Sequence, residues 1–569
     1  MRAHATDTVR WQRFEQATFD RAIQQDKPIL ISSGYLSCYW CHRMKQDSFE
    51  DDDVGELINQ TFIPVLLDRE LEPEIDSYLQ SFMLEQRGFG GWPATVILTP
   101  EAKPIAGFSY QTAAATLATI KQFKKYWSTN RAAVQASAVK KANQLKQTPS
   151  NSDSGTTLDT ARLLKNYLTQ TQRTADNEYG GFGQSEKFPL LPQLSTLLQL
   201  EKLDPNPALS EFLETSLQAM LGGALRDHIG GGFFRYSDTR EWSAPHFEQM
   251  LYTQALVAPL LFDAAEQWNQ PDLGAAATEV LQAMIAFFQR EDGLFRSALS
   301  AVSEQGESGG YYLWTNQQLM SLLGKDFTKI YSQPIGTAGN VLPLITVNGK
   351  QRQRVRQTLL QTRNLRSLKS DDKALLGWNG LALVALARGQ HLSPKIHRTG
   401  SRLFETLLPL TKTANWPRLI GVPEAGPAQL ADKVYLLAGL QSWALVTRDK
   451  ESLSEISTLI SSIHHQHFLN GQWQAAKDKP LIGRLVSPAL VDTELPSPTG
   501  LWLQVALNQL KVADTSASQP DITTLKTRIE QVLNTLPDTL EDNAFFHATT
   551  LSALIQHSRW QNRQQKGKQ

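Results

Sequence analysis

The chain has 569 residues, more than one compact core usually holds, so two or more domains are expected. Lys plus Arg number 56 and Asp plus Glu number 56, so the formal net charge is zero. This balance argues against a nucleic-acid or anionic-membrane binder that works through bulk charge. The first residues are polar and charged, and no apolar run approaches the roughly 18 residues of a membrane span. We therefore expect a cytoplasmic protein that binds neither nucleic acid nor membrane.

Residues 1–130 are predicted to form an α/β domain. The short apolar run "KPILISSGY" (27–35) is typical of a buried strand, and "FIPVLLD" (62–68) of a second one. Helices are expected over 51–60, 72–86 and 112–127. Between the last two, "GFGGWPATVILTPEAKPIAGFS" (88–109) predicts a Gly-rich turn, a Trp-Pro step and two strands joined by a turn.

The chain's two cysteines lie three residues apart in "SCYWCHRM" (37–44), at the predicted junction of a strand and a helix. Unpaired backbone N–H groups at a helix N-terminus stabilise a thiolate and lower its pKa. We expect Cys38 to be the exposed nucleophile and Cys41, one turn on, to be a buried resolving thiol. Pro93, after Trp92, is a candidate cis-proline that would present substrate backbone beside the dithiol.

Other interpretations of the cysteine pair stay open. A single bridge over two residues would not serve as a disulfide framework, but a structural role for two small buried thiols is conceivable. A zinc site with His42 lacks a second ligand pair in this region. Haem attachment through C-x-x-C-H would require export. A redox dithiol without a cofactor is favoured, although Tyr39 and Trp40 are large for such a site and could instead form an apolar platform for a partner.

Three motifs carry a resemblance to a known family. "KPILISSGYLSCYWCHRMKQDSFED", "FIPVLLDRELEPEID" and "GGWPATVILTPEAKP" resemble the thioredoxin-like domain of the spermatogenesis-associated protein 20 family. That family's C-H-W-C-H, S-F-E, D-R-E and G-G-W-P motifs are matched here except at Tyr39. The resemblance implies a thioredoxin-like fold over about a hundred residues.

Residues 131–159 are expected to be a connecting segment, and 160–569 a second, all-α domain. The stretch 136–159 is poor in large apolar residues, whereas apolar residues then recur at helical spacing almost without interruption. Gly- and aromatic-rich loops separate the helices, for example "DHIGGGFFRYSDTREWSAPHFEQM" (227–250). This pattern predicts six helical hairpins arranged as an (α/α)6 toroid.

The resemblance extends to this second domain. "DHIGGGFFRYSDTREWSAPHFEQMLY", "DKALLGWNGLALVALARG" and "LADKVYLLAGL" are similar to the family's C-terminal half, which implies a barrel of the six-hairpin glycosidase type, related to N-acylglucosamine and cellobiose 2-epimerases. A sugar site needs stacking aromatics and an acid/base pair. The candidates are His228, Arg235, Tyr236, Trp242, His246, Glu248, Tyr252, Trp378, Asn379 and Asp432.

A structural role for these barrel residues is the competing interpretation. His246 and Glu248 are a plausible base and acid, or a polar cap that ties the loop down. The chain also departs from the family at Thr253 and Gln254, at Val302, and in "PSPTG" (496–500). These changes remove carboxylate or amide positions near the presumed cleft.

The sequence therefore predicts a thioredoxin-like protein whose dithiol exchanges with a protein or small-molecule thiol or disulfide. Its helical barrel would bind a ligand or partner. One alternative is a carbohydrate-active enzyme, an epimerase or hydrolase, with a carbohydrate ligand in the barrel. The other is a non-catalytic interaction protein.

Overall fold

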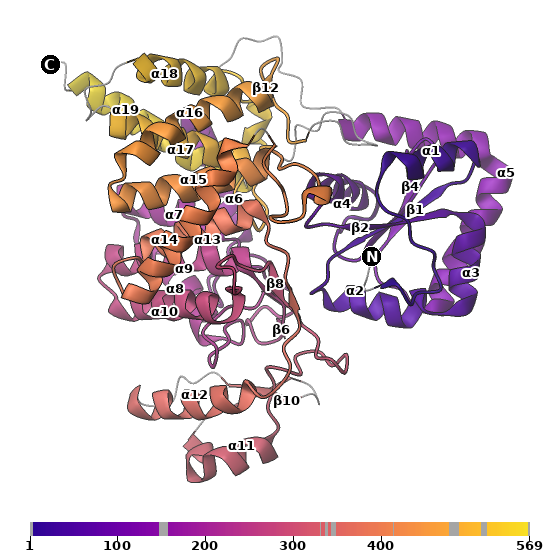
Figure 1. The fold of residues 1–569 in the computed structure, drawn as a ribbon, viewed down its shortest axis with the longest axis horizontal. Coiled ribbons are helices and arrows are strands. Elements are labelled where there is room, and N and C mark those ends of the chain that lie inside the picture. Colours follow the sequence, from indigo (N-terminus) through magenta and orange to yellow (C-terminus); the bar gives the residue numbers. More distant parts are fainter. Residues whose placement is uncertain are drawn as a thin grey trace. The chain divides into compact units, whose positions relative to one another are not determined.

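The computed structural model describes residues 4–146, 158–329, 332–335, 339–342, 349–413, 415–476, 489–513 and 520–566. The chain divides into two compact units (Figure 1). The first consists of residues 1–150 with 474–488, and the second of residues 151–473 with 489–569.

The first unit contains a four-stranded sheet flanked by helices. Its elements are α1 (Gln16–Gln24), β1 (Ile29–Gly34), α2 (Tyr39–Met44), α3 (Asp52–Thr61), β2 (Ile63–Asp68), α4 (Pro73–Arg87), β3 (Ala94–Leu98), β4 (Pro104–Phe108) and α5 (Ala113–Lys146). The strand order is β2-β1-β3-β4, with β1 parallel to β2 and antiparallel to β3. The predicted thioredoxin-like fold is thus confirmed.

Both faces of this sheet are buried, which explains why β1 has no polar alternation in its apolar part. Ile29 and Ile31 pack in one core cluster with residues of α1 and α4, while Leu30 points into a second cluster with residues of α3 and α5. Successive side chains of a strand point to opposite faces, so a sheet covered on both sides needs apolar residues at every position. The C-terminal end of β1, and the segment that follows it, are therefore held in a fixed position.

The connecting segment predicted from residue 131 is wrong up to Lys146. Backbone dihedral angles leave the helical region at Asn130, but α5 then continues to Lys146. Val134, Ala138 and Ala142 are buried at helical spacing, and Leu145 packs against the core of the first unit. Small apolar residues at this spacing are enough to hold a helix against a core. Residues 147–157 of the predicted segment lie outside the described residues.

The second unit is mainly helical. Its longer helices are α6 (Thr160–Thr174), α7 (Leu191–Leu203), α8 (Pro207–Gly222), α9 (Leu251–Trp268), α10 (Pro271–Ala283), α11 (Asn316–Leu323), α12 (Gly349–Arg363), α13 (Leu376–Arg388), α14 (Pro394–Leu407), α15 (Leu430–Thr447), α16 (Lys450–His467), α17 (Pro498–Ala513), α18 (Pro520–Leu533) and α19 (Ala548–Lys566). Its short strands are β5 (Tyr236–Ser237), β6 (Pro245–His246), β7 (Gln249–Met250), β8 (Ala298–Leu299), β9 (Gln333–Ile335), β10 (Gly339–Val341), β11 (Ser370–Asp371), β12 (Phe468–Leu469) and β13 (Gln472–Trp473).

Twelve of the described helices form two concentric rings. The inner ring closes on itself, because α7 contacts α9, α9 contacts α13, α13 contacts α15, α15 contacts α17, α17 contacts α19, and α19 contacts α7. The outer helices α8, α10, α14, α16 and α18 each pack on the inner helix that precedes them, and α6 packs on α19. This is the predicted (α/α)6 toroid, with its last hairpin closed by the two ends of the domain.

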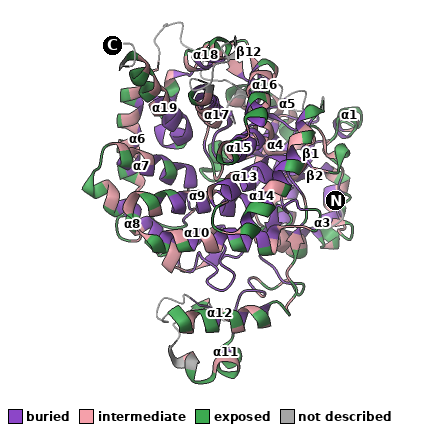
Figure 2. Ribbon diagram, turned by 60° about the vertical axis from the view of Figure 1, so that its left-hand side comes forward, coloured by how far each residue is buried: buried purple, intermediate pink, exposed green. Residues whose placement is uncertain are grey.

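The composition of each helix decides its ring. In α13 nearly every residue from Leu376 to Ala387 is buried, and α9 and α15 are similar. An outer helix such as α14 buries one stripe and exposes the opposite face (Figure 2). A helix that is apolar all round is stable only when protein surrounds it, whereas an amphipathic one belongs at the surface.

The two rings also fix the direction of the helices. Each inner helix is followed by an outer helix that returns antiparallel to it, so successive inner helices run the same way. Their N-terminal ends therefore gather at one end of the barrel. The loops that precede these helices, including residues 223–250 and 489–497, converge there.

Two glycines allow α13 and α15 to approach each other closely. A Cβ atom added at Gly380 would lie 2.4 Å from Leu436 Cα and 2.5 Å from Tyr435 O. One added at Gly439 would lie 2.2 Å from Gly380 O. The backbones of the two helices are thus in direct contact, and no side chain fits between them.

Helices α11 and α12 form an excursion from the ring between β8 and β11 (Figure 1). A small apolar cluster with Trp314, Leu319, Val355 and Leu359 holds them together, and Ile229 of the barrel joins it. In the described part of the chain, no helix combines the length and apolar composition needed to cross a membrane.

We expect Gly380→Ala to lower the free energy of unfolding of the barrel by about 3 kcal/mol, because the new methyl group would push two backbones apart. Urea unfolding followed by far-UV circular dichroism measures the change. Gly274→Ala in α10 is the matched control: its Cβ would meet Ala265 at an ordinary 3.6 Å, so helix propensity should leave stability unchanged or raise it by up to about 1 kcal/mol. Equal effects of the two substitutions would contradict the close approach.

Candidate functional site

Cys38 and Cys41 are joined by a disulfide across the first turn of α2. Cys38 is the N-cap residue, with extended dihedral angles, and its Sγ accepts a hydrogen bond of 3.1 Å from the Cys41 N–H. This is the position at which a helix offers unpaired N–H groups and the positive end of its dipole. A thiolate on Cys38 is therefore the better stabilised of the two.

The predicted exposures of the two cysteines are reversed. Cys38 is 3% exposed, whereas Cys41 is half-buried. The reason is the cap itself: because Cys38 Sγ accepts the Cys41 N–H, the side chain folds back over the first helical turn instead of projecting outward. The sequence placed the pair on the correct element but did not indicate the direction of the sulfurs.

Gly34 borders the disulfide, and Pro93 lies at the same end of the sheet. A Cβ atom on Gly34, the last residue of β1, would lie 2.9 Å from Cys41 Sγ. The register of β1 with β3 pairs Ser33 with Ala94, so Pro93 lies at the same end of the sheet as Gly34. The Trp92–Pro93 peptide bond is cis, as the sequence analysis expected.

A buried carboxylate that the sequence analysis missed connects these elements. Asp76 of α4 is 6% exposed, and its Oδ1 accepts hydrogen bonds from Ser33 Oγ at 2.6 Å and from Trp92 Nε1 at 2.9 Å. Burial raises the pKa of Asp76 above its ordinary value, and the nearby charge of Arg69 offsets this only in part. The Arg69 guanidinium lies 4.0 Å from the Trp92 ring centroid. The sequence feature that could have revealed Asp76 is the place of this carboxylate on the apolar face of α4, three residues before the buried Leu79.

Aromatic side chains surround the start of α2. Tyr39 and Trp40 meet edge to face at 5.1 Å, and Trp40 is 5.0 Å from Tyr110. Trp40 is 38% exposed. The His42 ring donates a hydrogen bond to the Leu36 carbonyl. Among the described residues, no group of three or more His, Cys, Asp or Glu side chains is arranged to hold a metal ion.

In the barrel, the predicted residues Arg235, Tyr252 and Trp378 come together at the N-terminal ends of the inner helices. Glu494 links them: it accepts two hydrogen bonds from Arg235, at 2.8 and 3.0 Å, and one from Tyr252 OH at 2.7 Å. Trp378 packs edge to face on Tyr252 at 4.9 Å. Arg235 is only 4% exposed, so this bidentate pair satisfies a buried charge.

Tyr236 and His246 form a stack beside this group. The two rings are parallel, with 4.1 Å between centroids, and Phe188 covers the other face of Tyr236 at 4.6 Å. His246 donates a hydrogen bond of 2.8 Å to Asp238. Burial, followed by the charge of Glu248, raises the pKa of Tyr236 well above its ordinary value. Both faces of the Tyr236 ring are therefore already covered by protein.

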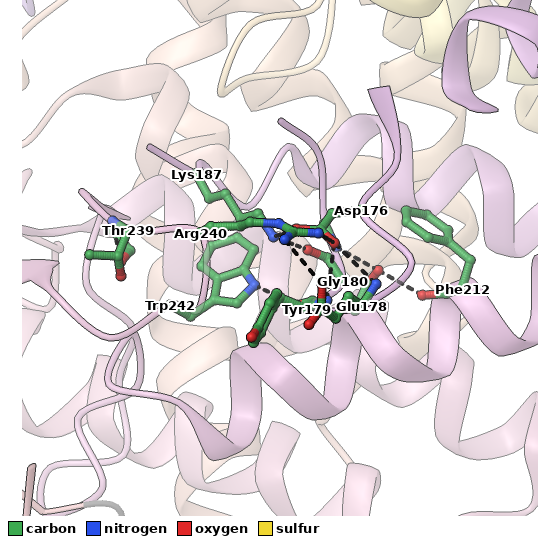
Figure 3. Close-up of polar contacts among 12 residues, drawn as sticks. Asp176, Glu178, Tyr179, Gly180, Lys187, Phe212, Thr239, Arg240 and Trp242 are labelled. Carbon is green, nitrogen blue, oxygen red and sulfur yellow. Dashed lines mark hydrogen bonds and ion pairs between the residues drawn. The ribbon is translucent and has the colours of Figure 1, made fainter. Parts of the chain in front are cut away.

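Trp242 belongs instead to a buried ion-pair cluster (Figure 3). Its indole N–H donates to the Tyr179 carbonyl. Next to it, Asp176 accepts a 2.6 Å bond from Lys187 and two bonds, of 2.7 and 2.9 Å, from Arg240. Burial alone would raise the pKa of Asp176, but these bonds outweigh it, and the pKa lies below its ordinary value. This cluster fastens the loop of residues 175–188 to the loop that carries Tyr236 and His246.

Asn379 and Asp432 are likewise engaged in holding the fold. The Asn379 side chain accepts from the Phe295 N–H and donates to the Phe295 carbonyl, which fixes a loop on α13. Asp432 caps α15 by accepting the Gln429 N–H and pairs with Arg418 Nε at 2.8 Å. These residues occupy structural positions, in agreement with the competing interpretation.

His228 and Glu248 are both buried. His228 donates a hydrogen bond to the Gly223 carbonyl at 2.9 Å. Burial and the charge of Arg226 lower its pKa to about 4, so the ring is neutral at pH 7. The structure thus gathers Arg235, Tyr252 and Trp378 around one acid, while His228 makes its own backbone bond.

Glu494 was missed because it lies 242 residues from Tyr252. Its only sequence signal was an acid in a short Pro-rich segment before a predicted helix.

Asp492, in the same segment, is fully buried and accepts hydrogen bonds from Ser497 N–H, Thr549 N–H and Thr549 Oγ1. Burial raises the pKa of Asp492 to about 6. This carboxylate fastens the segment that carries Glu494 to the start of α19.

Comparison with known proteins agrees with the two-part architecture. The family model described as Thioredox_DsbH, protein of unknown function, DUF255, matches residues 1–146. Spermatogenesis-associated protein 20 of Rattus norvegicus is 30% identical over 445 residues, which cover 68% of this chain and 56% of that protein. The chain is similar to spermatogenesis-associated protein 20. The resemblance predicted from the motifs around Cys38 and Cys41 is confirmed, and the chain spans about half the length of the curated relatives it matches.

Two solved structures show likeness to parts of the chain. Cellobiose 2-epimerase from Spirochaeta thermophila aligns with 65% of this chain and 82% of its own, at 14% identity and a TM-score of 0.43. A structure titled DsbH oxidoreductase aligns with 21% of this chain and 88% of its own, at 19% identity and a TM-score of 0.17.

We expect Glu494→Ala to lower the free energy of unfolding by about 3 kcal/mol, because the buried Arg235 loses both of its bonds to the carboxylate. Asp238→Ala is the control. Asp238 also pairs with a site residue, His246, but its side chain is 57% exposed, so the expected loss is below about 1 kcal/mol. Denaturant titration of both variants measures the difference, and comparable losses would contradict the assignment of Glu494 as the buried partner.

The raised pKa of Asp492 gives stability a defined pH dependence. Between about pH 4 and 6 the folded protein holds a proton on Asp492 that the unfolded chain releases, so this residue's contribution to stability falls as pH rises through that window. The free energy of unfolding of the wild type minus that of Asp492→Asn should decrease by about 2 kcal/mol from pH 4 to pH 7. Urea titrations across this range test it. A constant difference, or one that grows with pH, would show that Asp492 is ionised throughout.

Proposed function

We infer that the Cys38–Cys41 pair performs thiol–disulfide exchange in the cytoplasm, with a protein or small-molecule thiol or disulfide as its substrate. One observation carries this proposal. The only two cysteines of the chain are bonded across the first turn of a helix in a thioredoxin-like unit, next to a cis Trp92–Pro93 peptide bond. A chain of this size gains little stability from a bridge over two residues, so a chemical role explains the pair better than a structural one.

The exchange proceeds in two displacements. In the reduced protein the Cys38 thiolate attacks one sulfur of a substrate disulfide, a Cys38–substrate bond forms, and the other substrate sulfur leaves as a thiolate. The Cys41 thiolate then attacks Cys38 Sγ, which releases the second substrate sulfur and restores the Cys38–Cys41 disulfide. Two electrons pass from the dithiol to the substrate, and the reverse sequence oxidises a substrate dithiol.

The N-cap position supports Cys38 as the attacking sulfur. Its thiolate would face the Cys41 N–H and the positive end of α2, which lowers the pKa of a thiol. Because Cys38 is 3% exposed in the disulfide form, attack requires this sulfur to become accessible after reduction. Trp92 and Pro93 lie on the neighbouring strand end, where a substrate backbone would be presented.

Single-cysteine variants test the assignment. We expect Cys41→Ser, mixed with oxidised glutathione, to accumulate a mixed disulfide on Cys38, because the resolving thiol is absent. Intact-mass spectrometry after acid quenching detects it. The matched control is Cys38→Ser, which should form at least tenfold less adduct, since Cys41 is not at the N-cap.

Two outcomes would overturn parts of the proposal. Adduct on Cys41 in Cys38→Ser, without adduct on Cys38 in Cys41→Ser, would reverse the roles of the two cysteines. Taken alone, the exposures of the two sulfurs in the disulfide form favour that reversed assignment. If neither variant forms an adduct and the wild-type disulfide resists reduction across glutathione buffers, the pair does not exchange.

The barrel is proposed to bind a ligand or partner, and the group around Glu494 supports this by collecting an arginine, a tyrosine and a tryptophan at one end of the ring. A carbohydrate enzyme has less support. Tyr236, the aromatic candidate next to the proposed base His246, is covered on both faces, and Asp432 serves as a helix cap. A non-catalytic interaction protein would be favoured by a stable partner without turnover.

A further inference from the structure

Four arginines gather around the glycine-rich loop of residues 228–232, which begins with His228. Arg226 precedes this loop, and the other three, Arg352, Arg356 and Arg363, lie along α12. Among the described residues they form ion pairs with two carboxylates, Asp227 and Glu279. Four positive and two negative charges leave a local excess of two.

The pair of Arg363 with Asp227 is structural, although Arg363 Nε and Nη2 have no hydrogen-bond partner among the described residues. Arg363 is 1% exposed and donates to Asp227 Oδ1 at 2.7 Å. Its guanidinium also lies 4.9 Å from the Tyr311 ring centroid, and a Cβ on Gly230 would come within 2.5 Å of its Nη2. This side of the cluster is tightly packed. It fastens α12 to the loop.

The other side is different, because two arginines share one acid. Glu279 of α10 accepts from Arg226 Nη2 at 2.6 Å through one oxygen and pairs with Arg356 Nη1 at 3.2 Å through the other. Arg226 is 5% exposed, and its Nε has no hydrogen-bond partner among the described residues. Burial lowers the pKa of Arg226 to about 10, although Glu279 acts in the opposite direction. Arg356 also donates to the Ile229 carbonyl from Nε at 2.8 Å and to the Gly230 carbonyl from Nη2 at 3.4 Å. Glu279 is thus the one carboxylate shared by two guanidinium groups, and Arg356 is further held by the loop.

Arg352 adds a charge that no described residue balances. It lies one turn before Arg356 on the same face of α12. The described residues provide it with no hydrogen bond or ion pair, and its charge contributes to lowering the pKa of both Arg226 and His228. Arg352 thus lies close enough to affect two buried groups electrostatically, yet forms no hydrogen bond or ion pair with the described residues.

We propose that Arg226, Arg352 and Arg356 form a binding site for a small phosphate-type dianion. Planar guanidinium groups present paired N–H donors that match the oxygens of a phosphate group, and a doubly charged anion would cancel the excess of two. The net charge of the whole chain is zero, so bulk charge does not attract anions to the protein as a whole. The site is independent of the dithiol and adds a ligand to the barrel unit.

Isothermal titration with inorganic phosphate at constant ionic strength tests the site on the whole 569-residue chain. The wild type should bind one phosphate saturably, and Arg352→Ala should weaken binding at least tenfold, because it removes the arginine without a structural partner. The matched control is Arg354→Ala. Arg354 belongs to the same helix, is exposed, and projects about 200° around the helix axis from Arg352. Its removal should change affinity less than twofold.

Two results would overturn the proposal. The absence of saturable phosphate binding by the wild type would show that the charge excess is not a ligand site. Equal weakening by the two alanine variants would show that phosphate responds only to general charge. Unchanged circular dichroism of Arg352→Ala, expected because this side chain makes no hydrogen bond or ion pair with the described residues, separates loss of binding from loss of fold.

Discussion

The direction of the inner helices is the constraint on which the barrel depends. Once each inner helix is followed by an outer one that runs back along it, the six N-terminal ends must lie together, and every loop that precedes an inner helix must end there. The direct backbone contact of Gly380 with Gly439 holds two of these helices at a distance that no side chain permits. Polar residues just before or at the start of these helices, such as Glu494 and Tyr252, therefore meet although they are far apart in sequence. The positive ends of the helix dipoles also favour acids at this end of the ring, as at Asp432 and Asp492.

In the thioredoxin-like unit, residues that are far apart in sequence are also brought together. There the register of the strands in the sheet determines where they lie. The register of β1 with β3 places the cis Trp92–Pro93 bond beside the end of β1, and α2 starts shortly after that strand. Asp76 then ties the two strand ends together with one oxygen atom, through Ser33 and Trp92. A buried carboxyl is costly unless it is well hydrogen-bonded, so its retention in this place indicates that the position of Trp92 relative to β1 is important.

The sequence predicted those features that depend on local pattern. Apolar runs located the buried strands, helical spacing located both rings, and a proline at the start of a strand located the cis peptide bond. It failed where the outcome depends on side-chain direction or on distant partners. The C-x-x-C spacing fixed the helix but not which sulfur is covered, since that follows from the cap bond between Cys38 and the Cys41 N–H. Likewise, Asn379 and Asp432 looked suitable for chemistry, but each is bonded to a neighbouring loop or helix terminus. The short apolar stretch after residue 131 was too poor in large side chains to reveal that α5 continues.

Pairing of buried charges explains why so few of the polar candidates in the barrel remain available for chemistry. Lys187 with Asp176, Arg235 with Glu494, Arg418 with Asp432 and Arg363 with Asp227 each bring a cation out of water, and each requires its acid at short distance. A residue paired in this way cannot move or change its charge without leaving the charge of its partner buried and unpaired, and that state carries a large desolvation cost. It is therefore a poor choice for a group that must change charge during turnover. Groups without such a commitment are better candidates: the sulfurs of α2, which the fold does not need for stability, and Arg352, which no described acid neutralises.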